Sequence, residues 1–268
     1  MHLKTQQRLV SAPLWTAVVL VGLFMIFPVI AIIPMSLNEA DYLGFPPKGL
    51  SLRWYEEFFE SPDWKSALFV SLRVAIYTMV FSLGLGVPAS FAIVRGKFPG
   101  KQFITTLCAL PIVFPVIVSA VALYYFFGPL KLVGTELGLA LSHTTLALPV
   151  VILPTIAALR RFDMKLEWQA RNLGATKFKV FTTVTLPILK PAFFTAAIFA
   201  FITSFDEIIF AIFLGSGRKV SLPKEIWEGW RFQLEPTIAV IASFLVIGIA
   251  LLIASQIVIA FRHEKQSH

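Results

Sequence analysis

The sequence predicts an all-α polytopic membrane protein with six transmembrane helices and a cytoplasmic loop between the fourth and fifth helices. Composition supports this prediction, because hydrophobic residues make up 57% of the 268 residues and charged residues only 14%. In a soluble domain about a quarter of the residues are charged. The apolar residues also gather into long stretches, which can cross the ~30 Å hydrocarbon core of a bilayer as helices. We therefore expect a single transmembrane domain over residues 1–268.

Six apolar stretches account for the expected spans. Pro111 and Pro115 lie in the third stretch, and Pro149 and Pro154 lie in the fourth, so we expect kinks there. Between the first two stretches, residues 52–59 mix aromatic and acidic side chains, which predicts a helix at the membrane interface. The expected spans are residues 12–37, 66–94, 103–127, 144–159, 192–214 and 237–261.

The distribution of Lys and Arg predicts how the spans are oriented. One alternating set of segments carries 14 of the 23 Lys and Arg residues, and the other set carries eight. Because basic residues concentrate on the cytoplasmic side, we expect the first set, and with it both termini, in the cytoplasm. Membrane orientation thus explains the net charge of +8 without nucleic-acid binding. The first set is 1–11, 95–102, 160–190 and 262–268; the second is 38–65, 128–143 and 215–236.

Residues 160–190 form the long amphipathic segment of the chain. Leu166, Ala170 and Leu173 recur at helical spacing on one face. Gly174 interrupts this pattern, and a second short amphipathic run follows before the next apolar stretch. The pattern predicts two short helices at a bend on the cytoplasmic surface. A surface helix that merely connects two spans would show the same amphipathic pattern.

This segment resembles the coupling-loop motif of permeases from type I, binding-protein-dependent ABC importers. In that motif Glu-Ala-Ala precedes a hydrophobic residue and Gly-Ala, and Leu-Pro follows about ten residues later. The family's Glu position holds Trp168 and its first Ala position holds Gln169, while Glu167 lies one residue too early. Whether Glu167 replaces the family's coupling glutamate is therefore open. The residues that match in place are Ala170, Leu173, Gly174, Ala175, Leu186 and Pro187.

The resemblance implies a subunit that forms half of a translocation pore in a bacterial cytoplasmic (inner) membrane. It implies three partners: an ATPase homodimer that carries ATP and Mg, a second homologous permease in a heterodimer, and an external solute-binding protein. No cofactor is expected on this chain itself. The apolar face of the coupling segment would dock on the ATPase, and Arg171 and Lys177 would pair with its acids. The expected coupling residues are Leu166, Glu167, Ala170, Arg171, Leu173, Gly174, Ala175, Leu186 and Pro187.

Asp206 and Glu207 interrupt the fifth apolar stretch. A charged residue deep in a bilayer costs roughly 2.5–3.5 kcal/mol by insertion scales, so it normally faces protein or water. Neighbouring residues of a helix point about 100° apart, so we expect one acid in a translocation cavity and the other against a partner helix. The alternative is a structural pair satisfied by nearby hydroxyl groups. Tyr124 and Tyr125 are candidates for the same cavity, or alternatively packing and interface residues.

An enzymatic function has little support in the sequence. The chain contains no Gly-rich phosphate-binding loop of the Walker type, so ATP hydrolysis would have to come from another subunit. Cys108 is the single cysteine, which excludes a disulfide within the chain, and no cluster has metal-ligand spacing. The four histidines are His2, His143, His263 and His268.

Within the permease family, the chain is most similar to the subunits of spermidine/putrescine systems, in particular the second of the two. The resemblance rests on the coupling segment and on the Ser-Phe-Asp-Glu-Ile-Ile run at residues 204–209. It implies a polyamine substrate, although permeases for iron, opines, aminobutyrate or phosphonates share much of the pattern. Two other classes stay open: a secondary transporter with a proton or ion site at Asp206 or Glu207, and a membrane scaffold subunit.

Overall fold

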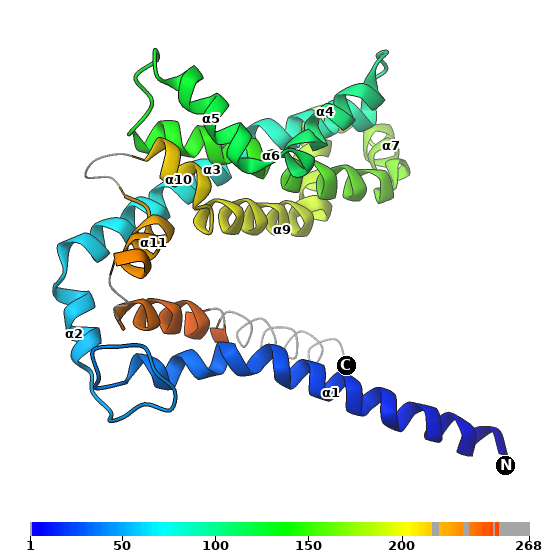
Figure 1. Ribbon diagram of the computed structural model, residues 1–268. Helices are drawn as coiled ribbons and strands as arrows, with labels where there is room; N and C mark the ends of the chain where they lie inside the picture. The colour runs from blue at the N-terminus through cyan, green and yellow to red at the C-terminus, as the bar shows by residue number, and fades with distance from the viewer. Residues whose placement is uncertain (1, 216–219, 233–235, 249, 252–268) are drawn as a thin grey trace. The chain divides into compact units, whose positions relative to one another are not determined.

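The computed structural model describes residues 2–215, 220–232, 236–248 and 250–251 (Figure 1). The regular secondary structure of these residues is helical, and their β pairing is limited to an isolated bridge between Asn38 and Leu50. The all-α prediction is therefore confirmed.

The chain divides into two compact units, and each is described by itself. Unit 1 comprises Met1–Pro62 and Ile226–His268, and unit 2 comprises Asp63–Glu225. That both units act as one transmembrane domain stays a prediction.

Unit 1 contains the first expected span and the expected interfacial helix. Within its first helix, Leu14–Ser36 is long and apolar enough to cross a membrane. The Oγ of Ser36 lies 2.7 Å from the hydroxyl of Tyr55, whose ring packs edge-on against Phe244 with centroids 5.5 Å apart. These contacts join three helices of the unit: α1 (His2–Ser36), α2 (Arg53–Glu60) and the apolar helix Thr237–Gly248.

Unit 2 is built around α6 (Glu136–Arg161), which packs against α3 (Pro62–Arg95) and α9 (Leu186–Phe205). Gly86 of α3 faces α6, where an added Cβ would lie only 2.8 Å from Val151 Cγ1. A small residue at this position lets the two helix backbones approach closely. A buried cluster joins the three helices through Ala147 and Val151 of α6, Ala196 and Ala200 of α9, and Met79, Leu83 and Val87 of α3.

The third expected span is broken rather than gently kinked. It consists of α4 (Lys101–Val113) and α5 (Val116–Phe127), which are bent by 103°. Phe114 is extended because the helical conformation is disfavoured for a residue that precedes proline, and Pro115 is the N-cap of the next helix. The predicted kink thus lies at Pro115, whereas Pro111 remains inside α4.

The fourth and fifth expected spans had incorrect boundaries. Helix α6 begins at Glu136, not 144, because the Thr135 side chain accepts a hydrogen bond from Gly138 N at 3.0 Å and caps it. The fifth span, expected to be one helix over 192–214, ends as α9 at Phe205 and resumes as α10 (Ile209–Leu214).

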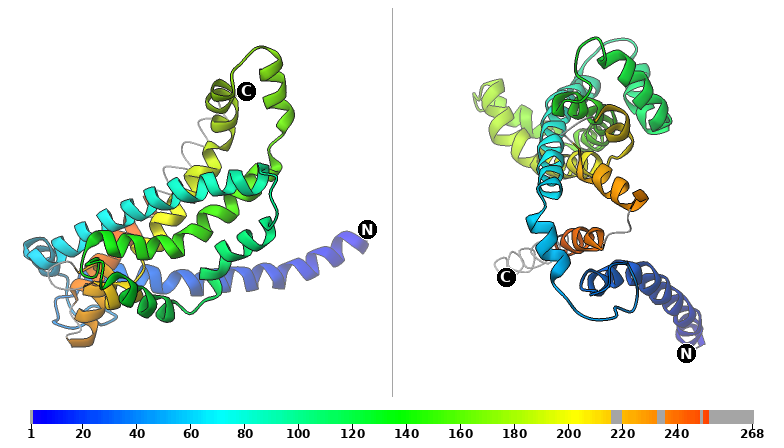
Figure 2. Two further views of the ribbon diagram at one scale, coloured as in Figure 1. Left: turned by 90° about the horizontal axis from the view of Figure 1, so that it is seen from above. Right: turned by 60° about the vertical axis from the view of Figure 1, so that its left-hand side comes forward.

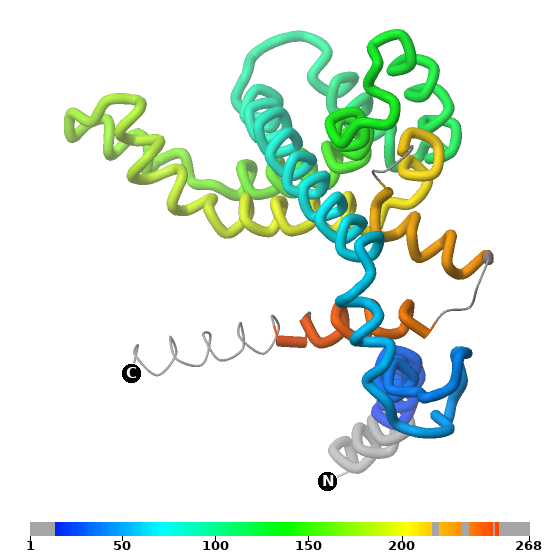
Figure 3. The backbone as a smooth tube through the Cα atoms, turned by 90° about the vertical axis from the view of Figure 1, so that its left-hand side faces the viewer, coloured from blue at the N-terminus to red at the C-terminus, as the bar shows by residue number. Residues whose placement is uncertain are grey.

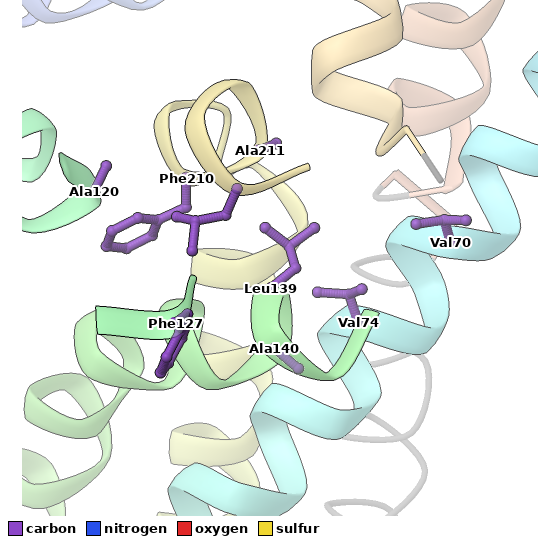
Figure 4. Packing of buried hydrophobic residues seen from close by; sticks show 9 residues of the cluster. Val70, Val74, Ala120, Phe127, Leu139, Ala140, Phe210 and Ala211 are labelled. Atoms are coloured by element: carbon purple, nitrogen blue, oxygen red, sulfur yellow. The ribbon is translucent and has the colours of Figure 1, made fainter. Parts of the chain in front are cut away.

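The short helix α10 is held by a buried apolar cluster (Figure 4). Phe210 and Ala211 of α10 meet Phe127 of α5, Leu139 of α6 and Val74 of α3 there. The helices that follow the two breaks, α5 and α10, are therefore packed against each other in the fold. The remaining buried members of the cluster are Val70, Ala120, Ala140 and Leu214.

The number of spans stays a prediction. Among the described residues, four helices are long and apolar enough to cross a membrane, or five if the bent α4–α5 pair counts as one span. Thr237–Gly248 is a shorter apolar helix. Most of the remainder of the sixth expected span, residue 249 and residues 252–261, lies outside the described part of the chain.

Candidate functional sites

Two short helices follow α6, at the position of the predicted coupling segment. They are α7 (Met164–Asn172) and α8 (Lys177–Val180), and they project from one end of unit 2 (Figures 2 and 3). Asp163 caps α7 and Thr176 caps α8 through their side chains. Gly174 lies between them with a φ of +88°, a left-handed conformation that glycine adopts without strain. The bend at Gly174 therefore follows directly from the sequence.

The outer surface of the two helices carries exposed apolar side chains. Leu173 is 89% exposed, and Leu166, Trp168 and Phe178 are exposed as well. No residue of α7 is buried. Exposed apolar side chains of this kind mark a surface that contacts another protein or the membrane. We call Leu166 and Leu173, which share one side of α7, together with Phe178 the apolar docking face; Trp168, two residues from Leu166, points to another side of α7. Ala170 and Ala175 are half-buried, and Arg171 and Lys177 are exposed.

Glu167 points in a different direction from this docking face. Its carboxylate accepts two hydrogen bonds from Arg95, at 2.7 Å from Nη2 and 3.1 Å from Nη1. The Thr185 hydroxyl donates a third. Arg95 ends α3, and Thr185 ends the π-helical turn η1 (Phe181–Thr185) that leads into α9. Glu167 is thus bonded within its own chain, while Leu186 and Pro187 form the exposed first turn of α9.

Asp206 and Glu207 lie in the break between α9 and α10, so the helical geometry expected for them was wrong. One oxygen of Glu207, Oε1, accepts hydrogen bonds from the backbone N of Ile209 at 2.6 Å and of Phe210 at 3.1 Å. Glu207 therefore satisfies the first amides of α10, and its negative charge lies at the helix N-terminus. Asp206 is exposed, and the structure records no side-chain hydrogen bond or ion pair for it among the described residues.

Tyr124 and Tyr125 are exposed on α5, with their rings edge-on and 5.7 Å apart. Helix α5 packs against α10 in the cluster of Figure 4. The tyrosines and the acidic pair are therefore carried by neighbouring elements of unit 2.

A buried polar contact of unit 2 was missed by the sequence analysis. His143 of α6 is buried and lies with Nδ1 2.8 Å from Ser204 Oγ of α9. Its ring stacks on Phe210, with centroids 5.9 Å apart. The only sequence signal was a single histidine within an apolar helix. No group of three or more His, Cys, Asp or Glu residues that could hold a metal ion occurs in the described ranges.

The long apolar helices and the broken spans are those of a multi-pass helical membrane protein. Residues 82–262 match the family described as "Binding-protein-dependent transport system inner membrane component", and the chain belongs to this family. It is therefore a permease subunit of an ABC importer and not an enzyme, and the ATPase is a separate subunit.

Individual relatives agree with this assignment. The chain is 27% identical to the spermidine/putrescine transport system permease protein PotC of Escherichia coli strain K12, covering 88% of this chain and 89% of PotC. It is 28% identical to the putrescine transport system permease protein PotI of the same organism, covering 96% of this chain and 94% of PotI. It is 29% identical to the trehalose permease SugB of Mycobacterium tuberculosis strain CDC 1551, over 86% of each chain.

The fold itself is also known from a solved structure. A bacterial ABC transporter involved in the import of the polysaccharide alginate matches with a TM-score of 0.69, over 95% of this chain and 96% of the other. The sequence identity is 16%, so this likeness concerns the fold alone.

Proposed function

We propose that this chain forms one half of the pore of an ATP-driven polyamine importer. The observation that carries the proposal is the similarity to PotC and PotI over most of the chain. Polyamines are cations, and the exposed carboxylate of Asp206 offers a group that attracts them in a protein-lined path. Tyr124 and Tyr125 supply aromatic faces, to which organic cations bind.

The proposal includes the partners that the machine requires. An ATPase homodimer would bind ATP and Mg, a second homologous permease would complete the pore as a heterodimer, and a solute-binding protein would deliver the polyamine from outside. Both termini and the α7–α8 pair would lie in the cytoplasm, where the basic segments concentrate. This chain would bind no cofactor of its own.

The apolar docking face would seat in a cleft of one ATPase subunit. Leu166 and Leu173 would supply the apolar contact, and Arg171 and Lys177, both exposed, would meet acidic groups on the ATPase. The small residues Ala170, Gly174 and Ala175 would allow close approach. Leu186 and Pro187 would start the span that carries the movement into the membrane.

The testing experiment measures ATP hydrolysis by the purified complex in lipid, with its binding protein loaded with spermidine or putrescine. Stimulation that requires the loaded binding protein is the expected result. Stimulation by trehalose instead would retain the importer and replace the substrate, as the similarity to SugB permits. Uptake that persists without any ATPase and collapses with an uncoupler would show a secondary transporter and overturn the proposal.

A further inference from the structure

Arg95 and Glu167 form a two-point ion pair between the last turn of α3 and the first turn of α7. The side chain of Glu167 is only 12% exposed and that of Arg95 28%. Two parallel hydrogen bonds between a guanidinium and a carboxylate fix the relative orientation of the two groups as well as their distance. Because the pair is sheltered, salt screens it less than a surface pair. The contact therefore fixes the position of the first turn of α7 relative to the last turn of α3.

Arg95 is itself held by two aromatic rings. Its Cζ lies 4.9 Å from the ring centre of Phe91 in α3 and 5.7 Å from that of Phe162. Phe162 is buried and immediately follows α6. Since a guanidinium stacks favourably on aromatic faces, the ends of α3 and α6 orient Arg95 toward Glu167.

Thr185 connects the same carboxylate to α9. Its hydroxyl donates to Glu167 Oε1, and the residue itself is buried at the end of η1. Single-turn π-helical segments within helices are frequent at functional sites. One carboxylate of α7 is therefore bonded to the ends of two spans, and through Arg95 it is joined to the end of a third.

Burial contributes little to holding α7 in place. The helix has nine residues, none of them buried. An isolated helix of this length is unstable in water, so its direction depends on the contacts that it makes. Its described contacts include those with its neighbours α8 and η1 and the hydrogen bonds of Glu167 with Arg95 and Thr185.

We propose that Arg95, Glu167 and Thr185 form a latch that makes α7 a rigid lever on α3 and α9. Glu167 is then a positioning residue that transmits movement inside this chain, and not a contact with the ATPase. This inference rests on the proposed function. Without the latch, closure of the ATPase would tilt α7 without moving the spans, and ATP would be hydrolysed without transport.

The test compares spermidine uptake with ATP hydrolysis by the same reconstituted complexes. Glu167→Gln and Arg95→Gln should each lower the uptake per ATP about tenfold, because each leaves a sheltered charge without its partner. Exchanging the two residues (Arg95→Glu with Glu167→Arg) should restore part of the ratio, since a threonine hydroxyl both donates and accepts, while the stacking of Arg95 on Phe91 and Phe162 is lost. The matched control is Arg73→Gln, which removes a similar ion pair with Glu136 from the same helix and should leave the ratio unchanged.

An unchanged ratio in both single variants would overturn the latch. If the wild-type complex shows no ATPase response to its loaded binding protein, the proposed function fails instead. The two failures are therefore distinguishable.

A spectroscopic measurement tests the latch without any substrate. A nitroxide at Arg171→Cys, in a Cys108→Ser background, reports the mobility of α7 in the purified permease complex. Glu167→Gln should narrow the lines of the electron paramagnetic resonance spectrum, because α7 becomes more mobile. Thr185→Val, which leaves no charge unpaired, should narrow the lines less. If the Glu167→Gln complex does not assemble, the Thr185→Val complex is measured instead. A Thr185→Val spectrum identical to that of the complex with Arg95, Glu167 and Thr185 intact would then refute the proposal.

Discussion

The Nδ1 atom of His143 lies 2.8 Å from Ser204 Oγ, and both side chains are buried between α6 and α9. Ser204 donates in turn to Thr78 Oγ1 at 3.1 Å, and Thr78 donates to the backbone oxygen of Ala140 at 3.2 Å. This direction of donation places the proton of His143 on Nδ1. The chain of hydrogen bonds links α6, α9 and α3 beside the break that precedes α10.

His143→Ala should lower the free energy of unfolding by about 1–3 kcal/mol, since it leaves the buried Ser204 hydroxyl without a donor. His143→Asn should recover part of the loss, because an amide nitrogen can replace Nδ1. The stability of both variants is measured by heating the purified complex and monitoring the loss of folded protein by size-exclusion chromatography. Equal losses in the two would show that ring packing on Phe210, rather than the hydrogen bond, stabilises the site.

Glu207→Ala should destabilise α10 by about 0.5–2 kcal/mol, the usual cost of removing a residue that caps a helix. The cause is the loss of the acceptor for the Ile209 and Phe210 amides. Glu207→Gln, which retains an acceptor oxygen, should cost less. Hydrogen–deuterium exchange of residues 209–214 is the appropriate measurement, with Asp206→Ala as the matched control.

Asp206→Asn should raise the KM for a polyamine about tenfold, which corresponds to the loss of one charge-assisted contact. Thermal stability should not change, because the side chain is exposed. Uptake into proteoliposomes at several polyamine concentrations measures this effect. An unaltered KM would remove Asp206 from the substrate path.

Gly174→Asp should abolish transport while leaving membrane insertion intact, because it adds a negative charge beside the apolar docking face. Gly174→Asn controls for the backbone, since Asn tolerates the left-handed conformation at a φ of +88° and has the same shape as Asp. Uptake and ATPase copurification should be measured for both. Normal uptake by the Asp variant at normal expression would refute the coupling role of α7.

Local patterns in the sequence were sufficient for most helices. Apolar length predicted α3 and α9, and helical periodicity with Gly174 predicted α7 and α8. These features depend on residues close together in the chain, so they can be recognised without the fold. The breaks were harder, because a hydrophobic stretch such as 192–214 has the same composition whether or not its helix is interrupted.

The sequence by itself determined the helical membrane class, the bend at Gly174 and the presence of an acidic pair in an apolar stretch, because composition and short-range spacing carry these features. Only the tertiary structure decided the environment of each acid. It separated Glu207, which caps α10, from the exposed Asp206. It also turned Glu167 toward Arg95, 72 residues away in the chain. Such pairings depend on which helices pack together, and packing is a property of the whole fold rather than of any segment.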